Sequence, residues 1–337
     1  MQILKLKPPF DVSFDAILPS LYQGVELKIK LSQPYAIEHL KAGLMLTDDS
    51  GTPLARIAIY QNPEIELNGQ LCIMLGAYEC IDNPDVSKQM FNVVFEYLNE
   101  QNNLGQVIGP MDGSSWNTYR FVSEENPMSP FLLEPFAKPW YPAQWKAAGF
   151  TSLMRYRSNI AGLSPELEVD FLPAQQKFEA KGIVFRAVNQ ADEDAELLRL
   201  ARFNLKAFQD AFLYTPISEQ AFVDKNRKIW SMLDPEMVQL ALFEHEICGL
   251  IFSYPDLLNP TGKTAVVKTL ARLPGEQFRG LGDVLCARIV HVLLKKGYTS
   301  MIHALMRETN ASLDNSSRFW GKSYKTYELY ILDTPFV

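Results

Sequence analysis

Cysteine is scarce in this sequence of 337 residues, and the marks of a secreted or membrane-spanning protein are missing too. The four cysteines (Cys72, Cys80, Cys248 and Cys286) form no CxxC pair, so we expect buried free thiols rather than disulfides or a metal site. No apolar run approaches the roughly 18 residues of a membrane-spanning helix, and the N-terminal segment lacks a signal-peptide pattern. These absences favour a soluble, cytoplasmic protein without a membrane partner.

Positive charge is also in deficit. Lys and Arg number 32 against 39 Asp and Glu, which gives a formal net charge of −7. This balance argues against a nucleic-acid partner bound through a broad basic face. The rest of the composition, 47% hydrophobic and 21% charged residues, is ordinary for a globular protein, and the length is sufficient for two domains.

The two halves of the chain show the same order of predicted strands and helices. The repeat is one of element order, since the halves share little residue identity. In the first half the periodicity predicts strands over 43–46, 54–60, 70–77, 107–108 and 153–156, and helices over 85–102 and just before Gly149. Asn83 and Pro84 are typical of a helix N-cap and of the first helical position.

The second half repeats this order. It predicts strands over 183–188, 238–243, 247–254, 263–271, 301–305 and 324–332, and helices over 193–209, 218–231, 281–296 and 311–320. Residues 161–181 contain two prolines and many polar residues, so we interpret them as a linker. Strands that alternate with helices predict an α/β protein with mixed α+β sheets. The expected domains are 1–160 and 182–337, each a central mixed sheet flanked by helices.

The strongest motif lies between the predicted strand 263–271 and the predicted helix 281–296, where residues 272–282 read RLPGEQFRGLG. Glycines at 280 and 282 allow the backbone to turn tightly and to approach a ligand without Cβ atoms in the way. The helix that follows presents unpaired N–H groups and the positive end of its dipole. The spacing therefore predicts an anion site that suits a pyrophosphate.

This loop resembles the Q/R-x-x-G-x-G/A loop of the GNAT acetyltransferase superfamily, matched here by Gln277, Gly280 and Gly282. The order of elements around it is also the family's, and Asn310 precedes Gly321 with the spacing of the family's N-x(10)-G segment. The resemblance implies acetyl-CoA as cosubstrate, its pyrophosphate on the loop and its thioester on N–H groups of the preceding strand. The implied residues are Leu270, Ala271, Arg272, Gln277, Phe278, Arg279, Gly280, Leu281, Gly282, Asp283 and Asn310.

The resemblance extends over the whole chain, to bacterial tandem GNAT proteins with a degenerate N-terminal copy. The counterpart of the loop in the first half, residues 80–86, contains no glycine and carries Asp82 and Asp85. Two carboxylates at this place would repel a phosphate. We therefore expect coenzyme A to bind the C-terminal copy alone.

The catalytic residues of the family are matched only in part. Many relatives carry a tyrosine, as proton donor to the thiolate, where this sequence has Ser317, and a glutamate base on the strand that here reads VVKT at 266–269. Tyr324 is then a candidate acid, and Glu308 or His303 a candidate base. For each of them an ordinary packing or solvated role is the alternative.

A long segment, 114–142, interrupts the first half and is rich in aromatic residues and proline. Such an insertion is often functional, so we expect it to line a substrate pocket between the halves, with Arg120 or Glu134 selecting the charge of the ligand. The alternative is a structural flap between the copies. The candidate substrate-binding residues are Trp116, Tyr119, Arg120, Glu134, Trp140 and Tyr141.

The sequence favours an acetyl-CoA-dependent N-acetyltransferase that acts on a small-molecule amine. We expect a monomer or a weak homodimer, because two fused copies imitate a dimer internally. A non-catalytic acetyl-CoA binder or sensor is the second interpretation, supported by the missing tyrosine and glutamate. A third, an aminoacyl-tRNA-dependent peptidyl-type transferase, is disfavoured by the intact loop and the net charge of −7.

Overall fold

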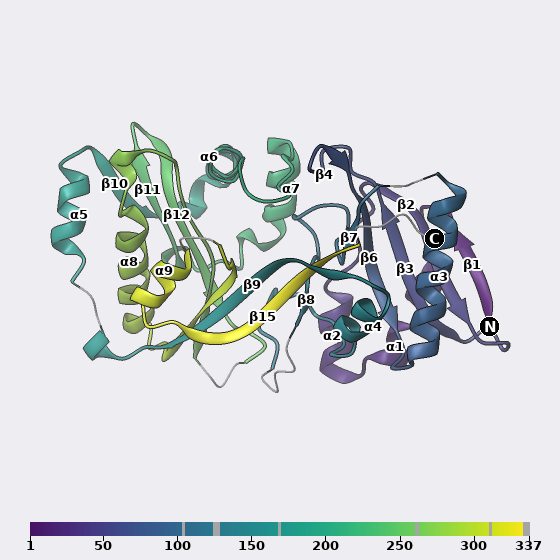
Figure 1. Ribbon diagram of the computed structural model, residues 1–337. Helices are drawn as coiled ribbons and strands as arrows, with labels where there is room; N and C mark the ends of the chain where they lie inside the picture. The colour runs from purple at the N-terminus through teal and green to yellow at the C-terminus, as the bar shows by residue number, and fades with distance from the viewer. Residues whose placement is uncertain (103–104, 124–128, 168–169, 260–262, 310–311, 333–337) are drawn as a thin grey trace.

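The computed structural model describes all residues except 103–104, 124–128, 168–169, 260–262, 310–311 and 333–337. Within the described residues, one mixed sheet of 13 strands runs through the molecule and helices cover it (Figure 1). β8 (Phe121–Val122) pairs with β15 beside the main path. The other strands follow in the order β1 (Gln2–Leu6), β2 (Leu40–Thr47), β3 (Pro53–Tyr60), β6 (Ile73–Cys80), β7 (Val107–Gly109), β15 (Lys322–Leu332), β9 (Thr151–Gly162), β14 (Ser300–Arg307), β13 (Thr264–Arg272), β12 (Glu246–Pro255), β11 (Val238–Phe243) and β10 (Ile183–Ala187).

The helices form close to where the periodicity predicts them. Asn83 caps the long first-half helix by accepting hydrogen bonds from the N–H groups of Asp85 and Val86, and Pro84 follows it. The short elements β1, α1 and α2, and the small hairpin of β4 (Glu66–Leu67) and β5 (Gln70–Leu71), were not predicted. The helices are α1 (Leu18–Leu21), α2 (Gly24–Leu31), α3 (Pro84–Glu100), α4 (Tyr141–Ala147), α5 (Leu172–Glu179), α6 (Glu193–Ala207), α7 (Glu219–Trp230), α8 (Leu281–Lys295) and α9 (Ser312–Arg318).

Each half has its own hydrophobic core, under α3 in the first half and under α8 in the second. In the N-terminal half, α3 buries Met90 and Phe91 in a cluster that also contains the fully buried ring of Trp145. In the C-terminal half, α8 buries Leu285 and Ile289 in a cluster with side chains of β11, β12 and β13. Burying a side chain of this size stabilises the fold by about 1.5–3 kcal/mol, so these helical faces fix the position of both helices on the sheet.

The two halves exchange strands at the centre of the sheet. β9, which ends the first half, pairs antiparallel with both β14 and β15 of the second half. β15 in turn pairs with β7 of the first half, with Tyr330 opposite Gly109. In Figure 1, β9 and β15 run side by side between the two lobes. The mixed α/β class is confirmed, and the two expected sheets are joined into one because β9 and β15, of 12 and 11 residues, reach both halves.

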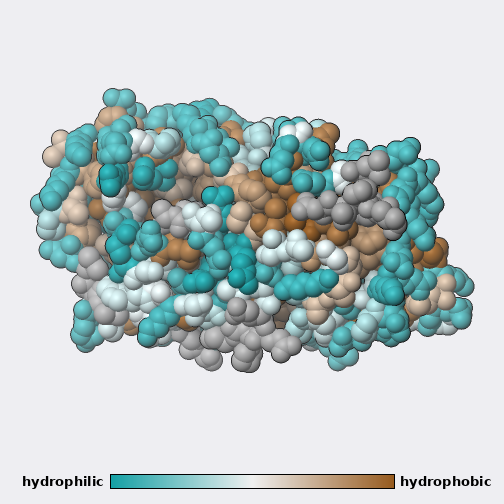
Figure 2. All heavy atoms as spheres, viewed as in Figure 1, coloured by the Kyte–Doolittle hydropathy of each residue, from teal (hydrophilic) through white to brown (hydrophobic). Residues whose placement is uncertain are grey.

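The predicted boundary at residue 160 falls inside a strand, since β9 continues to Gly162. The expected linker, 161–181, includes a packed helix, α5, whose Phe178 is buried in the core under α8. On the face shown in Figure 2, polar residues cover the two ends, and hydrophobic residues gather in the middle, between the lobes.

The described part of the chain contains no helix that is long and apolar enough to cross a membrane. All four cysteines are free and buried, which confirms the prediction of buried thiols.

Candidate functional site

Strands β13 and β14 separate in the middle of the C-terminal half, and this fork is the first part of the site. They pair in parallel up to Val267, which lies opposite His303, and no further pairing between them follows along these fully described strands. Beyond this point β13 continues on β12 alone, with a bulge whose extra residue is Lys268. The bulge therefore places a lysine where the two strands branch.

The main-chain N–H groups of β13 beyond the fork point to alternate sides. The N–H of Leu273, just after the strand, donates to the carbonyl oxygen of Cys248 on β12 at 2.9 Å. Because antiparallel residues alternate between bonded and non-bonded pairs, the N–H of Ala271 is turned toward β12, and those of Leu270 and Arg272 toward the fork. Two of the three main-chain donors implied by the resemblance thus face the open side.

The N-terminus of α8 is the second part of the site. Gly280 is its N-cap, with a φ of +86° that residues with a Cβ rarely adopt, and a Cβ added there would meet nothing within 4 Å. The N–H groups of Asp283 and Val284 donate to the carbonyl of Gly280, whereas those of Leu281 and Gly282 have no acceptor among the described residues. Together with the helix dipole, these groups make an open anion site.

The side chains of the loop before α8 divide into buried and exposed ones. Phe278 and Leu281 are buried in the core under α8, so they offer only main-chain groups to a ligand. Gln277 and Arg279 are exposed. The guanidinium of Arg279 is 79% exposed and lies 3.6 Å from the carboxylate of Glu276, a weak surface pair that leaves its charge available to an anion.

Asp283 places a negative charge in the first turn of α8, and α9 neutralises it. Its Oδ1 accepts hydrogen bonds from Asn315 Nδ2 and from Arg318 Nη2, each at 2.7 Å. This pairing offsets the repulsion that a free carboxylate would exert on a bound phosphate. Asn310, the remaining implied cofactor residue, lies outside the described residues.

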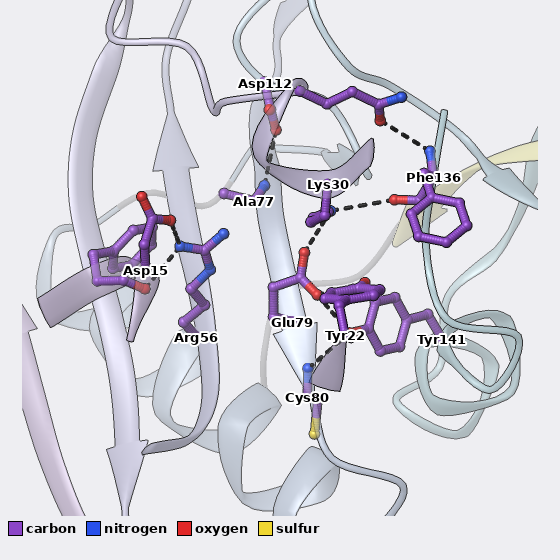
Figure 3. Close-up of polar contacts among 12 residues, drawn as sticks. Asp15, Tyr22, Lys30, Arg56, Ala77, Glu79, Cys80, Asp112, Phe136 and Tyr141 are labelled. Atoms are coloured by element: carbon purple, nitrogen blue, oxygen red, sulfur yellow. Dashed lines mark hydrogen bonds and ion pairs between the residues drawn. The ribbon is translucent and has the colours of Figure 1, made fainter. Parts of the chain in front are cut away.

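The N-terminal half has a fork of the same kind, but its own side chains fill it (Figure 3). β6 pairs in parallel with β7 only as far as Met74 and then separates from it. Asp112 Oδ1 accepts the N–H of Ala77 at 2.8 Å, and Tyr141 Oη accepts the N–H of Cys80 at 3.3 Å. The N–H groups of Ala77 and Cys80 are thus already bonded within the N-terminal half.

A buried charged cluster completes this filling (Figure 3). Glu79, whose side chain is fully buried, lies 2.5 Å from Lys30 Nζ and accepts hydrogen bonds from the hydroxyls of Tyr22 and Tyr141. Trp140 Nε1 donates to the carbonyl of Cys80 at 3.0 Å. Two of the candidate substrate residues, Trp140 and Tyr141, are therefore bonded within the N-terminal half.

Two of the candidate catalytic residues are bonded elsewhere, Ser317 within its own helix and Glu308 to a residue of β9. Ser317 is exposed on α9, and its hydroxyl donates to the carbonyl of Leu313 at 3.0 Å, as serines inside helices commonly do. Glu308, just after β14, lies 3.2 Å from Arg157 Nη2. Neither arrangement directs the side chain to the fork.

His303 is a hydrogen-bonded core residue on β14. Its Nδ1 lies 2.5 Å from the hydroxyl of Ser316, which itself accepts a hydrogen bond from Asn159 Nδ2 at 2.9 Å. The serine hydroxyl has one proton and two lone pairs, so it can donate to Nδ1 of a neutral ring. Burial lowers the pKa of His303 to about 4, so it is a weak base at neutral pH.

Tyr324 lies beside the fork. Its ring packs on a cluster that contains Val266 of β13 and Ile302 of β14, close to where the two strands separate. Burial, with smaller contributions from Glu134 and Asp256, raises the pKa of Tyr324 to about 12. The hydroxyl is therefore protonated at neutral pH and able to donate a proton.

The segment 114–142 joins the two halves. Trp116 packs edge-on against Phe222 of α7, and its Nε1 donates to the carbonyl of Thr215 at 2.8 Å. Glu134 is buried and lies 2.8 Å from Lys325 Nζ on β15. These contacts favour the alternative given above for Trp116 and Glu134, a structural role between the copies.

Lys268 is a site residue that the sequence analysis did not single out. Its Nζ lies 3.4 Å from the carbonyl of Leu133. Burial and then the charge of Arg120 lower the pKa of Lys268 to about 8. The signal in the sequence is a single charge in the apolar stretch TAVVKTLA. The family pattern has a carboxylate on this strand, so it does not indicate a lysine at this place.

Tyr119 and Arg120 lie between the halves. The guanidinium of Arg120 is 3.9 Å from the ring centroid of Tyr119 and 4.0 Å from that of Tyr156 on β9. Arg120 is 6% exposed and lines a small cavity together with Ala77 and Asp112 of the N-terminal fork. Of the six candidate substrate residues, Arg120 lines this cavity, and the ring of Tyr119 packs against its guanidinium.

No protein-family model and no curated protein matches this sequence. Solved structures match in fold. The GCN5-related glucosamine N-acetyltransferase region of a fungal multi-domain GH3 β-N-acetylglucosaminidase superposes with a TM-score of 0.60 and 12% identity, over 98% of this chain and 38% of that one. This chain therefore spans well under half of the fungal protein.

Two further matches cover nearly the full length of both chains. A GCN5-related N-acetyltransferase from Sphaerobacter thermophilus has a TM-score of 0.55 and 10% identity, over 98% of this chain and 95% of the other. A tandem GNAT protein from the clavulanic acid biosynthesis pathway has a TM-score of 0.52 and 10% identity, over 98% of each chain. These structures show that the chain has a tandem GNAT fold, as the sequence motifs predicted.

Proposed function

We propose that the chain is an acetyl-CoA-dependent acyltransferase that acetylates a small-molecule amine. The observation that carries the proposal is the open anion site at the N-terminus of α8, directly after a strand whose free edge borders a fork. The N-terminal half has the same strands with a filled fork, which supports binding of the cofactor by the C-terminal half alone. The likeness to GNAT structures supports the same class of reaction.

The residues present fit acetyl-CoA. The N–H groups of Leu281 and Gly282 would hold the pyrophosphate with the help of the α8 dipole, and the exposed guanidinium of Arg279 would add charge. The N–H groups of Leu270 and Arg272 would bind the pantetheine and the thioester oxygen, as preorganised donors. Bound acetyl-CoA supplies the acetyl group in activated form, as a thioester.

Two side chains at the fork would move the protons. Lys268, with a pKa of about 8, is neutral in about a tenth of the molecules at pH 7 and accepts the proton that the acceptor ammonium loses. The amine nitrogen forms a bond to the acetyl carbon while the carbon–sulfur bond breaks. Tyr324, which is protonated at this pH, would donate its proton to the departing sulfur, and the tyrosinate would take up the second proton that the nitrogen loses as the amide forms.

Release of free thiol from acetyl-CoA, measured across a panel of primary amines, tests this function. We expect turnover with at least one amine, and a kcat that falls about 10²-fold in Tyr324→Phe because a positioned acid is lost. The affinity for acetyl-CoA, measured by calorimetry, should not change. Tyr298→Phe is the matched control, since this hydroxyl contacts only Met237 Sδ, at 3.7 Å, among the described residues.

A second candidate is an acetyl-CoA-binding protein without transferase activity. Two observations favour it. β13 carries no carboxylate, and the Ser317 hydroxyl is bonded within its own helix. Binding of acetyl-CoA without thiol release from any amine would support this candidate and contradict acetyl transfer.

A further inference from the structure

Arg120 is a buried cation for which the described residues provide no anionic partner. It directly precedes β8, and two tyrosine rings enclose its guanidinium, at 3.9 and 4.0 Å. Its Nε and Nη1 atoms are buried and have no hydrogen-bond partner in the described part of the chain. Burying a charge without a partner is costly, and contacts with aromatic faces offset only part of that cost.

Three neighbouring buried cations, unlike Arg120, each have a carboxylate partner. Arg56 is bonded to the carboxylate of Asp15 and to a main-chain carbonyl, Lys30 is paired with Glu79, and Lys325 with Glu134. No ion pair is found for Arg120 or for the nearby Lys268 among the described residues, so this part of the molecule favours a ligand anion.

The cavity beside Arg120 has the size of a small terminal group. Its volume is about 30 Å³, which holds about two water molecules, or the two oxygens of a carboxylate. It is too small for a nucleotide or a pantetheine arm. Its charged lining residues are Lys30, Arg56, Arg120 and Asp112. Lys30 and Arg56 are already paired with Glu79 and Asp15, so Arg120 is the lining cation that remains open to a ligand.

The position of Arg120 links this cavity to the fork of β13. Val122 of β8 pairs with Tyr327 of β15, and Tyr327 pairs with Tyr156 of β9, which the guanidinium covers. The charge of Arg120 also acts on Lys268 at the branching point, and Coulomb interactions fall with distance. A carboxylate held by Arg120 would therefore leave the rest of a small ligand near the fork.

We propose that Arg120 binds the carboxylate of the acceptor, and that the acceptor is a small amino acid whose amine lies at the fork of β13 and β14. This inference rests on the proposed function, because the amine is acetylated there. A planar guanidinium edge matches a carboxylate in two hydrogen bonds, which a lysine or a main-chain donor could not reproduce.

Calorimetry with paired product analogues tests the inference. The probes are the N-acetyl derivatives of L-alanine, L-leucine, L-glutamate, L-lysine and L-phenylalanine, each compared with its C-terminal amide, in the presence and in the absence of coenzyme A. We expect at least one acid to bind ten times or more tightly than its amide. Inorganic phosphate, tested alone, should bind more weakly than this acid.

The variants separate a ligand role from a structural one. Arg120→Gln should abolish the preference for the acid over the amide, and Arg120→Lys should retain part of it. Lys225→Gln, which removes a cation already bonded to Asn117 between the halves, should retain the preference in full. A structural role for Arg120 would lower the melting temperature of Arg120→Gln while the acid-to-amide ratio stayed at the wild-type value.

The failures of the two proposals are distinguishable. If acetyl-CoA binds and every acid binds no better than its amide, or phosphate binds more tightly than any acid, the inference about the acceptor is overturned. If acetyl-CoA does not bind, the proposed function fails, and the titrations without coenzyme A still report whether Arg120 holds a carboxylate.

Discussion

At the scale of single residues, burial decides which candidates can do chemistry. His303, Tyr324 and Lys268 all lie near the fork, and desolvation lowers the pKa of the histidine to about 4, raises that of the tyrosine to about 12 and lowers that of the lysine to about 8. Of these three residues, only the lysine has a pKa close to neutral pH, where a general base is effective. Sequence patterns identify titratable residues, but the desolvation that sets their pKa depends on packing between segments far apart in the chain.

The buried neutral His303 predicts a loss of stability in acid. Its pKa is about 4 in the folded protein and about 6.5 when unfolded, so between these values the unfolded chain binds more protons. Stability is complete above about pH 6.5 and falls as the pH decreases toward 4. We expect the free energy of unfolding to drop by about 2 kcal/mol more in the wild type than in His303→Asn between pH 7 and 4.5.

Urea unfolding of both proteins at the two pH values measures this difference. The comparison cancels the contributions of groups that the two proteins share, such as Asp112, whose pKa burial raises to about 6. An identical pH dependence in both proteins would contradict a neutral buried imidazole.

At the scale of elements, the two forks show how one arrangement of strands serves as a site in one half and as core in the other. Residues such as Asn83, Pro84 and Gly280 mark helix starts from local rules alone, and these predictions are confirmed. The sequence could not predict that side chains occupy the N-terminal fork. Asp112 and Tyr141 bond to β6 from segments that lie more than 30 residues further along the chain.

The hydrogen bonds that Tyr141 makes in the N-terminal fork predict that Tyr141→Phe destabilises the protein. The change removes a hydroxyl that donates to Glu79 at 2.7 Å and accepts from the N–H of Cys80, and both partners are buried. Leaving them unsatisfied should lower the free energy of unfolding by about 1–3 kcal/mol, measured by chemical denaturation.

Tyr214→Phe is the control for this prediction, since its buried hydroxyl has no hydrogen-bond partner in the described residues and its loss should cost little. Equal effects of the two changes would show that the hydroxyl of Tyr141 does not hold the N-terminal fork closed.

At the scale of the whole molecule, the exchange of β9 and β15 makes one cooperative body of two copies. The repeated element order in the sequence predicts the two copies. β9 and β15 have ordinary strand patterns, however, and no local pattern predicts which strands they pair with. The pairing depends on long-range register, with Tyr156 opposite Tyr327 and Tyr330 opposite Gly109, and this is settled by packing between the halves.

This exchange predicts that both halves unfold together. We expect calorimetry to show one transition whose calorimetric and van't Hoff enthalpies agree. Leu329→Ala, at a fully buried position of β15, should destabilise the protein by about 2–5 kcal/mol and raise hydrogen exchange in α3 and α8 alike. Two separate transitions, or a change confined to one half, would contradict the shared centre.

The most direct test of the central claim is the binding of acetyl-CoA to two variants of one glycine in the first turn of α8. A Cβ on Gly282 meets only Leu270, at 3.8 Å or more, so Gly282→Ala and Gly282→Glu should both fold, and a glutamate is favourable at a helix N-terminus. We predict that the wild type and Gly282→Ala bind acetyl-CoA equally well, and that Gly282→Glu binds at least about tenfold more weakly, because its carboxylate repels the pyrophosphate. Undiminished binding by a folded Gly282→Glu protein, or no binding by the wild type, would contradict the account.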